Sequence, residues 1–344
     1  QQVVGGRVRY SGQRVALQLT AGRNTDTSDN YQGTTPTDRF ATNRDSASLQ
    51  GDITLAPGQL LTLGADWSRD AGGVFGGFSA FEASRDNQAG FAQYQGKFGK
   101  HDLQLSARHD DNQLFGGQDT GSVAWGLDTA HGLRLTASYG SAFKAPSFNE
   151  LYYPYYGNPD LLPETSRSAE LGIGRRSVGW HWQLNAWQTR VGDLIVYDPT
   201  IFVANNIESA RIRGAELVVG TTLAGWDVNA QASLMDPRNH SVGAYDKLLP
   251  RRSRRSARID ADRAFGGWKL GTSVVVQGQR YDDVQNSLAL GGYATVDLRL
   301  ERSLGDWTVQ AGLRNAFDRA YETAAFFNQP GREWQLTLRY ASTP

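Results

Sequence analysis

Apolar and polar residues alternate at every second position along most of this chain, and this alternation constrains its fold more than any other feature. In residues 226–234 the apolar positions are Trp226, Val228, Ala230, Ala232 and Leu234. Successive side chains of a β-strand point to opposite faces, so such a segment has one apolar and one polar face. The same pattern recurs at residues 132–142, 295–301, 307–313 and 334–340. We therefore predict an all-β protein.

The alternating segments are long, and the connections between them are short and long in turn. We count about seventeen segments of roughly 9 to 13 residues, whereas strands of soluble domains average about 5 to 6. Short turns are expected at Gly12-Gln13, Pro57-Gly58, Gly99-Lys100, His131-Gly132, Val178-Gly179, Ala224-Gly225, Gly266-Gly267 and Gly305-Asp306. Longer loops are expected near residues 24–40, 71–86, 112–117, 143–164, 198–205, 236–247, 281–290 and 318–331. All long loops then lie at one end of the strands, which is typical of a transmembrane antiparallel β-barrel.

Four tryptophans support a position in a membrane. Each of them directly follows a short turn: Trp180, Trp226, Trp268 and Trp307. Indole rings favour the headgroup level of a bilayer, so these four are expected to form an aromatic girdle at the short-turn end. A soluble β-propeller or sandwich is the alternative, but we find no repeat of about 40 to 50 residues that a propeller would need.

The composition argues against several classes of function. Among 344 residues, 35 are Lys or Arg and 35 are Asp or Glu, so the net charge does not indicate a nucleic-acid partner. The chain has no cysteine, which excludes disulfides and thiolate metal sites. It also lacks the His-Glu-x-x-His, Gly-x-Ser-x-Gly and phosphate-loop motifs of common enzymes. We interpret His109-Asp110-Asp111 as a polar rim and predict no enzymatic activity and no cofactor required for chemistry.

The connection 141–166 is rich in proline and aromatic residues. Its tyrosines include Tyr152, Tyr153, Tyr155 and Tyr156. Tyrosine gives a large contact area at a low entropic cost, so these residues could form a ligand platform. They could instead pack the loop onto its neighbours over the barrel mouth. The sequence leaves both interpretations open.

Two charged stretches also lie in predicted loops. Asp26, Asp29 and Asp38 stand among Thr, Ser and Asn residues, and several oxygen ligands in a loop suit calcium, although a merely soluble acidic loop is the alternative. The run 251–255 is Arg-Arg-Ser-Arg-Arg, which could attract anionic lipid headgroups or a ligand phosphate. The alternative for this run is a solvated rim and lumen wall.

Two motifs in the connection 141–166 carry a family resemblance. Phe143-Lys144-Ala145-Pro146 ends one strand, and Asn158-Pro159-Asp160-Leu161-Leu162-Pro163-Glu164 leads into the next. Together they resemble the signature of TonB-dependent outer-membrane receptors. Further segments that resemble the later strands of this family are residues 206–216, 315–322 and 330–333. Within the family, the chain is most similar to receptors for cobalamin.

The resemblance implies a barrel of about 22 strands around a plug domain. With about seventeen strands here, residues 1–344 are expected to form a single, partial barrel domain in which the plug and the first strands are absent. The strand directions agree, because the first and last strands would run parallel and could not pair in an antiparallel barrel. Expressed alone, the chain is then expected not to close into a heat-resistant barrel.

The resemblance also implies active transport across the bacterial outer membrane. The expected ligand is cobalamin or a related corrinoid, with an iron siderophore as the alternative. Expected partners are the TonB-ExbB-ExbD energy complex, acting through the missing plug, and lipopolysaccharide and other outer-membrane lipid. A passive porin or structural barrel is the alternative of another class.

Site residues follow from the same resemblance. Asn87, Arg280 and Phe327 fall near positions that face the corrinoid in cobalamin receptors, and Asn158 belongs to the loop signature. Those receptors have a tyrosine at the position of Phe327, so a polar contact is lost there. Structural calcium is predicted in the extracellular loop that carries Asp26, Asp29 and Asp38.

Overall fold

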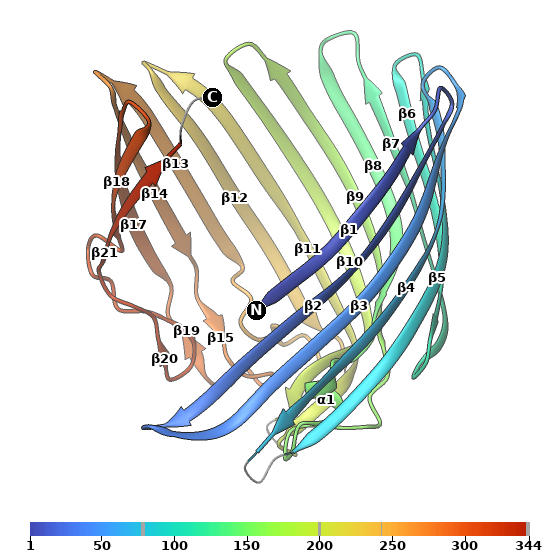
Figure 1. Cartoon of the computed structure of the whole chain (residues 1–344). Helices are drawn as coiled ribbons and strands as arrows, with labels where there is room; N and C mark the ends of the chain where they lie inside the picture. The colour runs from blue at the N-terminus through green and yellow to red at the C-terminus, as the bar shows by residue number, and fades with distance from the viewer. Residues whose placement is uncertain (77–79, 199–200, 242, 342–344) are drawn as a thin grey trace. The chain divides into compact units, whose positions relative to one another are not determined.

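The computed structural model of the protein describes residues 1–76, 80–198, 201–241 and 243–341, and it consists almost entirely of β-structure (Figure 1). Seventeen strands belong to one sheet, as the alternation predicted. These strands are β1 (Gln2–Ser11), β2 (Val15–Gln32), β3 (Thr35–Ala56), β4 (Gln59–Phe75), β5 (Phe81–Phe98), β6 (His101–Asn112), β7 (Gly116–Asp128), β8 (Leu133–Lys144), β9 (Glu164–Ser177), β10 (Trp180–Asp198), β11 (Val203–Leu223), β12 (Trp226–Asn239), β13 (Arg255–Phe265), β14 (Trp268–Gln277), β17 (Tyr293–Leu304), β18 (Trp307–Arg314) and β21 (Glu333–Tyr340).

The remaining elements lie in the long connections. β15 (Arg280–Tyr281) pairs with β16 (Ala289–Leu290), and β19 (Glu322–Ala324) pairs with β20 (Phe327–Asn328). The described residues include one short helix, α1 (Phe148–Tyr152), which was not predicted from the sequence. No helix among the described residues is long and apolar enough to cross a membrane.

The chain divides into two compact units. The first contains residues 1–127, 136–169 and 190–209, and the second contains residues 128–135, 170–189 and 210–344. Within each unit, strands that follow one another in the sheet pair antiparallel, as β2 with β3 in the first and β12 with β13 in the second.

The register keeps apolar residues opposite apolar residues on one face of the sheet. In β11 and β12, Leu217 lies opposite Ala232 and Ala215 lies opposite Leu234. Leu234 is 61% exposed. An exposed apolar row that alternates with a polar row is expected where strands face hydrocarbon. This row also fixes the register, since a slip of one residue would turn it to the opposite face.

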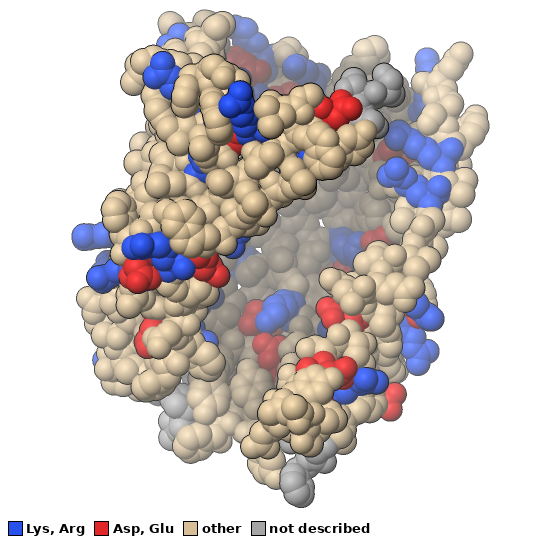
Figure 2. Space-filling model, turned by 60° about the vertical axis from the view of Figure 1, so that its left-hand side comes forward, with Lys and Arg blue, Asp and Glu red and all other residues tan. Residues whose placement is uncertain are grey.

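Charged side chains form small groups of both signs, separated by broad uncharged surface (Figure 2). Ion pairs also join neighbouring strands: between β2 and β3, Arg23 Nε lies 2.6 Å from Asp45 Oδ1. Pairing of this kind between neighbouring strands brings some of the 70 charged residues (35 basic, 35 acidic) together and is one reason why areas without charge remain between the groups.

All eight predicted short turns are confirmed, because each lies between two consecutive strands. Ala224 and Gly225 show the local reason, with φ angles of 51° and 78°. Such left-handed residues match the twist of the flanking strands in a tight hairpin.

The predicted long loops are only partly correct. Residues 24–40 are wrong as a loop, because β2 and β3 continue through them and pair as far as Gln32 and Thr35. Residues 71–86 are also mostly strand, since β4 ends at Phe75 and β5 begins at Phe81. Strands rich in polar residues such as threonine and serine can pair in water, outside the membrane. These strands therefore extend beyond their apolar parts.

The four tryptophans lie where the sequence placed them, each as the first residue of a strand after a short turn: Trp180, Trp226, Trp268 and Trp307. In the second unit, arginine guanidinium groups lie over three of the rings. Arg302 lies 4.7 Å from the Trp268 ring centre, Arg175 lies 5.6 Å from that of Trp180, and Arg263 lies 5.9 Å from that of Trp226. An arginine over an indole face gains a cation–π attraction.

Candidate functional site

The connection between β8 and β9 is ordered by its own short helix. Ser147 is the N-cap of α1, and its Oγ accepts a hydrogen bond from the Glu150 backbone N–H at 3.3 Å. Glu150 Oε2 accepts one in return from the Ser147 backbone N–H at 2.7 Å. This reciprocal capping box satisfies two donors that a helix start leaves free.

A small apolar cluster holds this connection in place. Leu151, Leu161 and Ala204 are buried together, and each is at most 2% exposed. The partly buried residues packed against them are Phe115, Tyr152, Tyr156 and Ile195. The cluster joins the connection to β10 and β11 within the first unit, so the connection behaves as part of the fold.

The structure assigns packing roles to three of the four predicted tyrosines. Tyr152 contacts Phe148 and Phe81, with ring centres 6.4 Å and 6.2 Å apart. The other packed pairs, each with ring centres 6.1 Å apart, are Tyr153 with Phe40 and Tyr156 with Tyr197.

Tyr155 differs from the other tyrosines. It is 87% exposed and has a left-handed φ of 61°. A non-glycine residue in this region is uncommon and costs about 1 kcal/mol or more. Of the four tyrosines, Tyr155 is the most exposed.

Asn158 has a structural role in the same connection. Its Nδ2 donates to the Ala204 carbonyl at 3.2 Å, and its Oδ1 accepts from the Asp160 N–H at 3.0 Å. Its own backbone N–H donates to the Glu150 carbonyl at 2.7 Å. The side chain predicted as a ligand contact therefore closes the loop onto β11.

Asn87 lies in a polar cavity of about 470 Å³ in the first unit, beside Phe143 and Ala145 of the signature motif. Its Nδ2 donates to Asp110 Oδ1 at 2.8 Å, and its Oδ1 accepts from Asn112 Nδ2 at 3.1 Å. These side chains lie on the polar face of β5 and β6, opposite the exposed apolar face. Asn87, a predicted ligand contact, therefore lies in a cavity that offers both hydrogen-bond donors and acceptors.

An arginine that the sequence did not single out crosses this cavity. Arg108 Nη1 donates to Asp66 at 2.6 Å, and Arg108 Nε donates to Asp110 at 2.7 Å. Asp70 lies between two further arginines, 3.5 Å from Arg44 and 3.7 Å from Arg85. Three arginines and three aspartates thus balance one another along the cavity wall. The only sequence signal was that Arg108 and Asp110 share one face of a strand.

Arg280 and Phe327 lie on two different hairpins of the second unit, Arg280 on β15–β16 and Phe327 on β19–β20. Arg280 is 5% exposed, its guanidinium lies 5.4 Å from the Tyr293 ring centre, and its Nη2 donates to the Glu322 carbonyl. Within the described residues, its Nη1 has no hydrogen-bond partner. Phe327 is 68% exposed on β20, whose partner strand β19 contains Glu322. The hydrogen bond from Arg280 to Glu322 therefore joins the hairpin of Arg280 to the hairpin that carries Phe327.

The three predicted calcium ligands lie on hairpin β2–β3. Asp29 is already paired with Arg39, with Oδ1 and Nε 2.7 Å apart, and this pairing lowers the pKa of Asp29. Asp26 lies opposite Thr42 in the ladder, and Asp38 lies on β3. In the part of the chain that the structure describes, no three His, Cys, Asp or Glu residues gather as a metal site. Calcium here stays a prediction.

His109 and Asp110 point to different partners. His109 Nδ1 lies 2.7 Å from Asp119 on the exposed side of β6, whereas Asp110 is buried beside Arg108. The side chains of adjacent strand residues face opposite ways. The two residues therefore form no catalytic pair with each other.

Comparison with known proteins gives a family match over most of the chain. A family model described as "TonB dependent receptor-like, beta-barrel" matches residues 3–316. The vitamin B12 transporter BtuB of Photobacterium profundum is 28% identical over 345 residues, covering 98% of this chain and 56% of that protein. BtuB of Vibrio vulnificus is 29% identical over 314 residues, covering 86% of this chain and 50% of that protein. The chain thus spans about half the length of these relatives.

Solved structures share the fold at lower identity. The siderophore receptor PiuA of Acinetobacter baumannii has a TM-score of 0.81 and 12% identity, covering 98% of this chain and 64% of that chain. The copper transporter OprC has a TM-score of 0.79 and 18% identity, with the same coverage of both chains.

Proposed function

Because the chain belongs to the TonB-dependent receptor β-barrel family of the bacterial outer membrane, we propose that it is the barrel portion of a receptor that takes up cobalamin or a related corrinoid. The mechanism is binding without bond chemistry. Extracellular loops capture the ligand, and energy from the TonB-ExbB-ExbD complex, transmitted through a plug domain, opens a path inward. Calcium bound at Asp26, Asp29 and Asp38 is part of this proposal.

The polar cavity around Asn87 carries the proposal. Its wall combines amides with arginines and aspartates that neutralise one another. Such a wall offers donors and acceptors without excess charge, which suits a large ligand rich in amide groups. A strongly anionic iron chelate would need an excess of cationic groups at this wall. The names of the two BtuB relatives, both vitamin B12 transporters, also support a corrinoid as the ligand.

Uptake by cells tests the proposed function. We expect energy-dependent uptake of radiolabelled cobalamin in cells that lack their own cobalamin receptor and carry the complete gene. Uptake of a labelled ferric siderophore without uptake of cobalamin would make the protein a siderophore receptor. Equal, energy-independent passage of unrelated small solutes would make it a passive pore.

A pair of variants tests the cavity itself. Asn87→Ala removes an amide that faces the cavity, and we expect weaker cobalamin binding to the complete protein, by about tenfold. Gln104→Ala is the matched control, because Gln104 bonds to Gln93 and does not line this cavity. Equal affinity in both variants would place the ligand elsewhere.

A further inference from the structure

The Asn87 amide in the polar cavity of the first unit is held from both sides. Its Nδ2 donates to Asp110 Oδ1, and its Oδ1 accepts from Asn112 Nδ2. Asp110 is 4% exposed and Asn112 is 5% exposed, and both line the same cavity as Asn87. Two nearly buried side chains therefore decide how this amide lies.

Arg108 fixes the charge of Asp110. Its Nε donates to Asp110 Oδ2 at 2.7 Å, its Nη2 donates to Asp110 Oδ1 at 2.9 Å, and its Nη1 reaches Asp66. Asp66, Ala89 and Asp110 form one row across β4, β5 and β6, and the small side chain of Ala89 leaves room for the guanidinium between the two aspartates. Pairing with a guanidinium favours the ionised carboxylate, which accepts hydrogen bonds and donates none.

The two neighbours specify the same orientation of Asn87. Because the ionised Asp110 only accepts, the group of Asn87 that faces it is the amide nitrogen. On the other side, Asn112 Oδ1 accepts from the Leu114 backbone N–H at 3.1 Å, so Asn112 turns its own nitrogen toward Asn87. The partner of that nitrogen is the Asn87 carbonyl oxygen.

This orientation decides what Asn87 has left for a ligand. A side-chain amide has two N–H donors and an oxygen that accepts two hydrogen bonds. Among the described residues, Asp110 takes one N–H and Asn112 takes one acceptor position. One donor and one acceptor position remain on a residue that lines the cavity.

Asparagine at position 110 would not keep this arrangement, although it has nearly the same shape as aspartate. Its single oxygen could face Asn87, but its nitrogen would then face the donors of Arg108. With the oxygen toward Arg108, its nitrogen would face the nitrogen of Asn87. A carboxylate is needed because it accepts on both sides.

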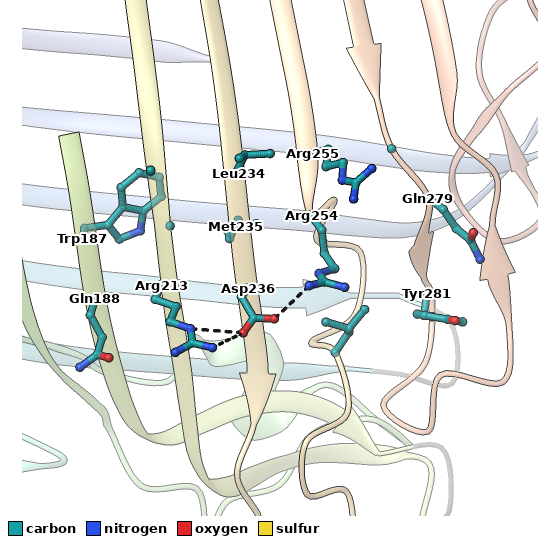
Figure 3. Close-up of a pocket in the computed structure, with 14 residues that line it drawn as sticks. Trp187, Gln188, Arg213, Leu234, Met235, Asp236, Arg254, Arg255, Gln279 and Tyr281 are labelled. Atoms are coloured by element: carbon teal, nitrogen blue, oxygen red, sulfur yellow. Dashed lines mark hydrogen bonds and ion pairs between the residues drawn. The ribbon is translucent and has the colours of Figure 1, made fainter. Parts of the chain in front are cut away.

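Asp236 of the second unit has similar charged partners but a different role. It accepts from Arg238 Nε at 2.8 Å and from Arg213 Nη2 at 3.1 Å, and it lies 3.5 Å from Arg254. Figure 3 shows Asp236 between Arg213 and Arg254 at the wall of a cavity of about 940 Å³. Its side-chain partners among the described residues are arginines, so Asp236 orients no amide.

We propose that Asp110 and Asn112 are positioning residues that hold the Asn87 amide in one orientation, in which it pairs with a carboxamide group of the ligand. The inference rests on the proposed function, because the corrinoid supplies the carboxamide. Such a group has both a donor and an acceptor and matches what Asn87 has left, whereas a carboxylate has acceptors alone. Arg108 supports this role by keeping Asp110 charged.

A double-mutant cycle on the complete protein tests the positioning role. The affinity for cyanocobalamin is measured in the wild type, Asn87→Ala, Asp110→Asn and the double variant. We expect each single variant to bind about tenfold more weakly and the double variant to bind no more weakly than Asn87→Ala, because Asp110 then has no amide to position. Asp236→Asn is the matched control, since it also removes a carboxylate charge beside arginines, and its affinity should be unchanged.

Two further measurements sharpen the test. Asn112→Ala gives a second cycle that leaves the Arg108–Asp110 pair intact, and it decides the result if circular dichroism shows that Asp110→Asn does not fold. Cobalamin derivatives in which one side-chain amide is hydrolysed to a carboxylate test the ligand group. We expect at least one of them to bind the wild type about tenfold more weakly than cobalamin does, with a smaller difference in Asn87→Ala.

The outcomes separate the inference from the proposed function. No binding of cyanocobalamin by the wild type would refute the proposed function. Binding by the wild type, with losses that add up in the double variants, would show that Asp110 and Asn112 act apart from Asn87 and would overturn the inference alone. Equal binding of every carboxylate derivative would remove the role of the carboxamide.

Discussion

Two connections of the first unit, the β8–β9 connection (residues 145–163) and the outer part of hairpin β2–β3 (residues 24–40), are ordered in different ways. The β8–β9 connection has a capped helix and a buried apolar cluster. The hairpin has a strand ladder that shifts register between Asp29 and Tyr31 and ends at Gln32 and Thr35, with most of its side chains exposed. One connection is held by side chains and the other by backbone hydrogen bonds.

Proline explains the difference. The β8–β9 connection contains Pro146, Pro154, Pro159 and Pro163. Proline has no backbone N–H and cannot donate to a ladder, so this segment is ordered by burial instead. The hairpin has one proline, Pro36, directly after its turn. Its other residues keep their donors, and the two strands continue to pair outside the membrane.

The largest expected effect comes from the apolar cluster. Leu161→Ala removes a side chain that is 2% exposed, and we expect local opening of the β8–β9 connection to become easier by about 2 to 5 kcal/mol. Amide hydrogen exchange on the complete protein measures this opening. Leu162→Ala is the matched control, because Leu162 is 57% exposed. Similar amide exchange in both variants would contradict the interpretation that buried side chains order the β8–β9 connection.

The helix cap is expected to have a smaller effect. Ser147→Ala removes the hydroxyl that accepts from the Glu150 N–H, and N-cap losses of this kind cost about 0.5 to 2 kcal/mol. The same exchange measurement should show faster exchange at the start of α1. Ser147→Asp keeps a capping oxygen and should restore most of the protection. A loss in Ser147→Asp equal to that in Ser147→Ala would rule out capping as the cause.

High pH should loosen the β8–β9 connection. Burial, together with the charge of Glu150, raises the pKa of Tyr156. A tyrosine whose folded pKa is raised adds stability that is fully present below its unfolded pKa, about 10, and is lost as the pH rises through the folded value. We expect proteolysis of this connection to increase above about pH 10. In Tyr156→Phe, which keeps the ring without the ionisable group, this increase should be smaller.

The smallest effect is expected in the hairpin. Arg39→Gln removes the ion pair with Asp29, and both side chains are exposed to solvent. Because exposed ion pairs contribute little, amide exchange of β2 and β3 should change hardly at all. Marked loss of protection in this variant would show that side chains hold the hairpin as well, which would erase its contrast with the β8–β9 connection.

The short turns and the membrane-crossing parts of the strands could be predicted because each has a strict local requirement. Tight hairpins need residues with positive φ, as at Gly225, and hydrocarbon requires apolar residues at every second position. Outside the membrane, a strand does not need an apolar residue at every second position. Thr25, Asp26 and Thr27 therefore look like a loop in sequence although they are paired in β2.

The candidate site was harder to predict, because its contacts join distant parts of the chain. Arg108 contacts Asp66 on a different strand, and one sequence gives no signal for that pair. Helix α1 had a signal in Ser147 and Glu150, the capping-box residues, but five residues are too few for helical periodicity. Packing and exposure of the tyrosines depend on partners such as Phe40, which lies on β3.

The anchored β8–β9 connection also has a kinetic consequence. Its helix, its buried cluster and the bond from Arg85 to the Pro146 carbonyl are all contacts within the chain itself. A ligand that lands on the exposed Tyr155 ring meets a surface whose ordering cost is already met by folding. If the proposed function uses this surface, we expect the rate of capture to be limited by diffusion and orientation, and not by the closing of the loop.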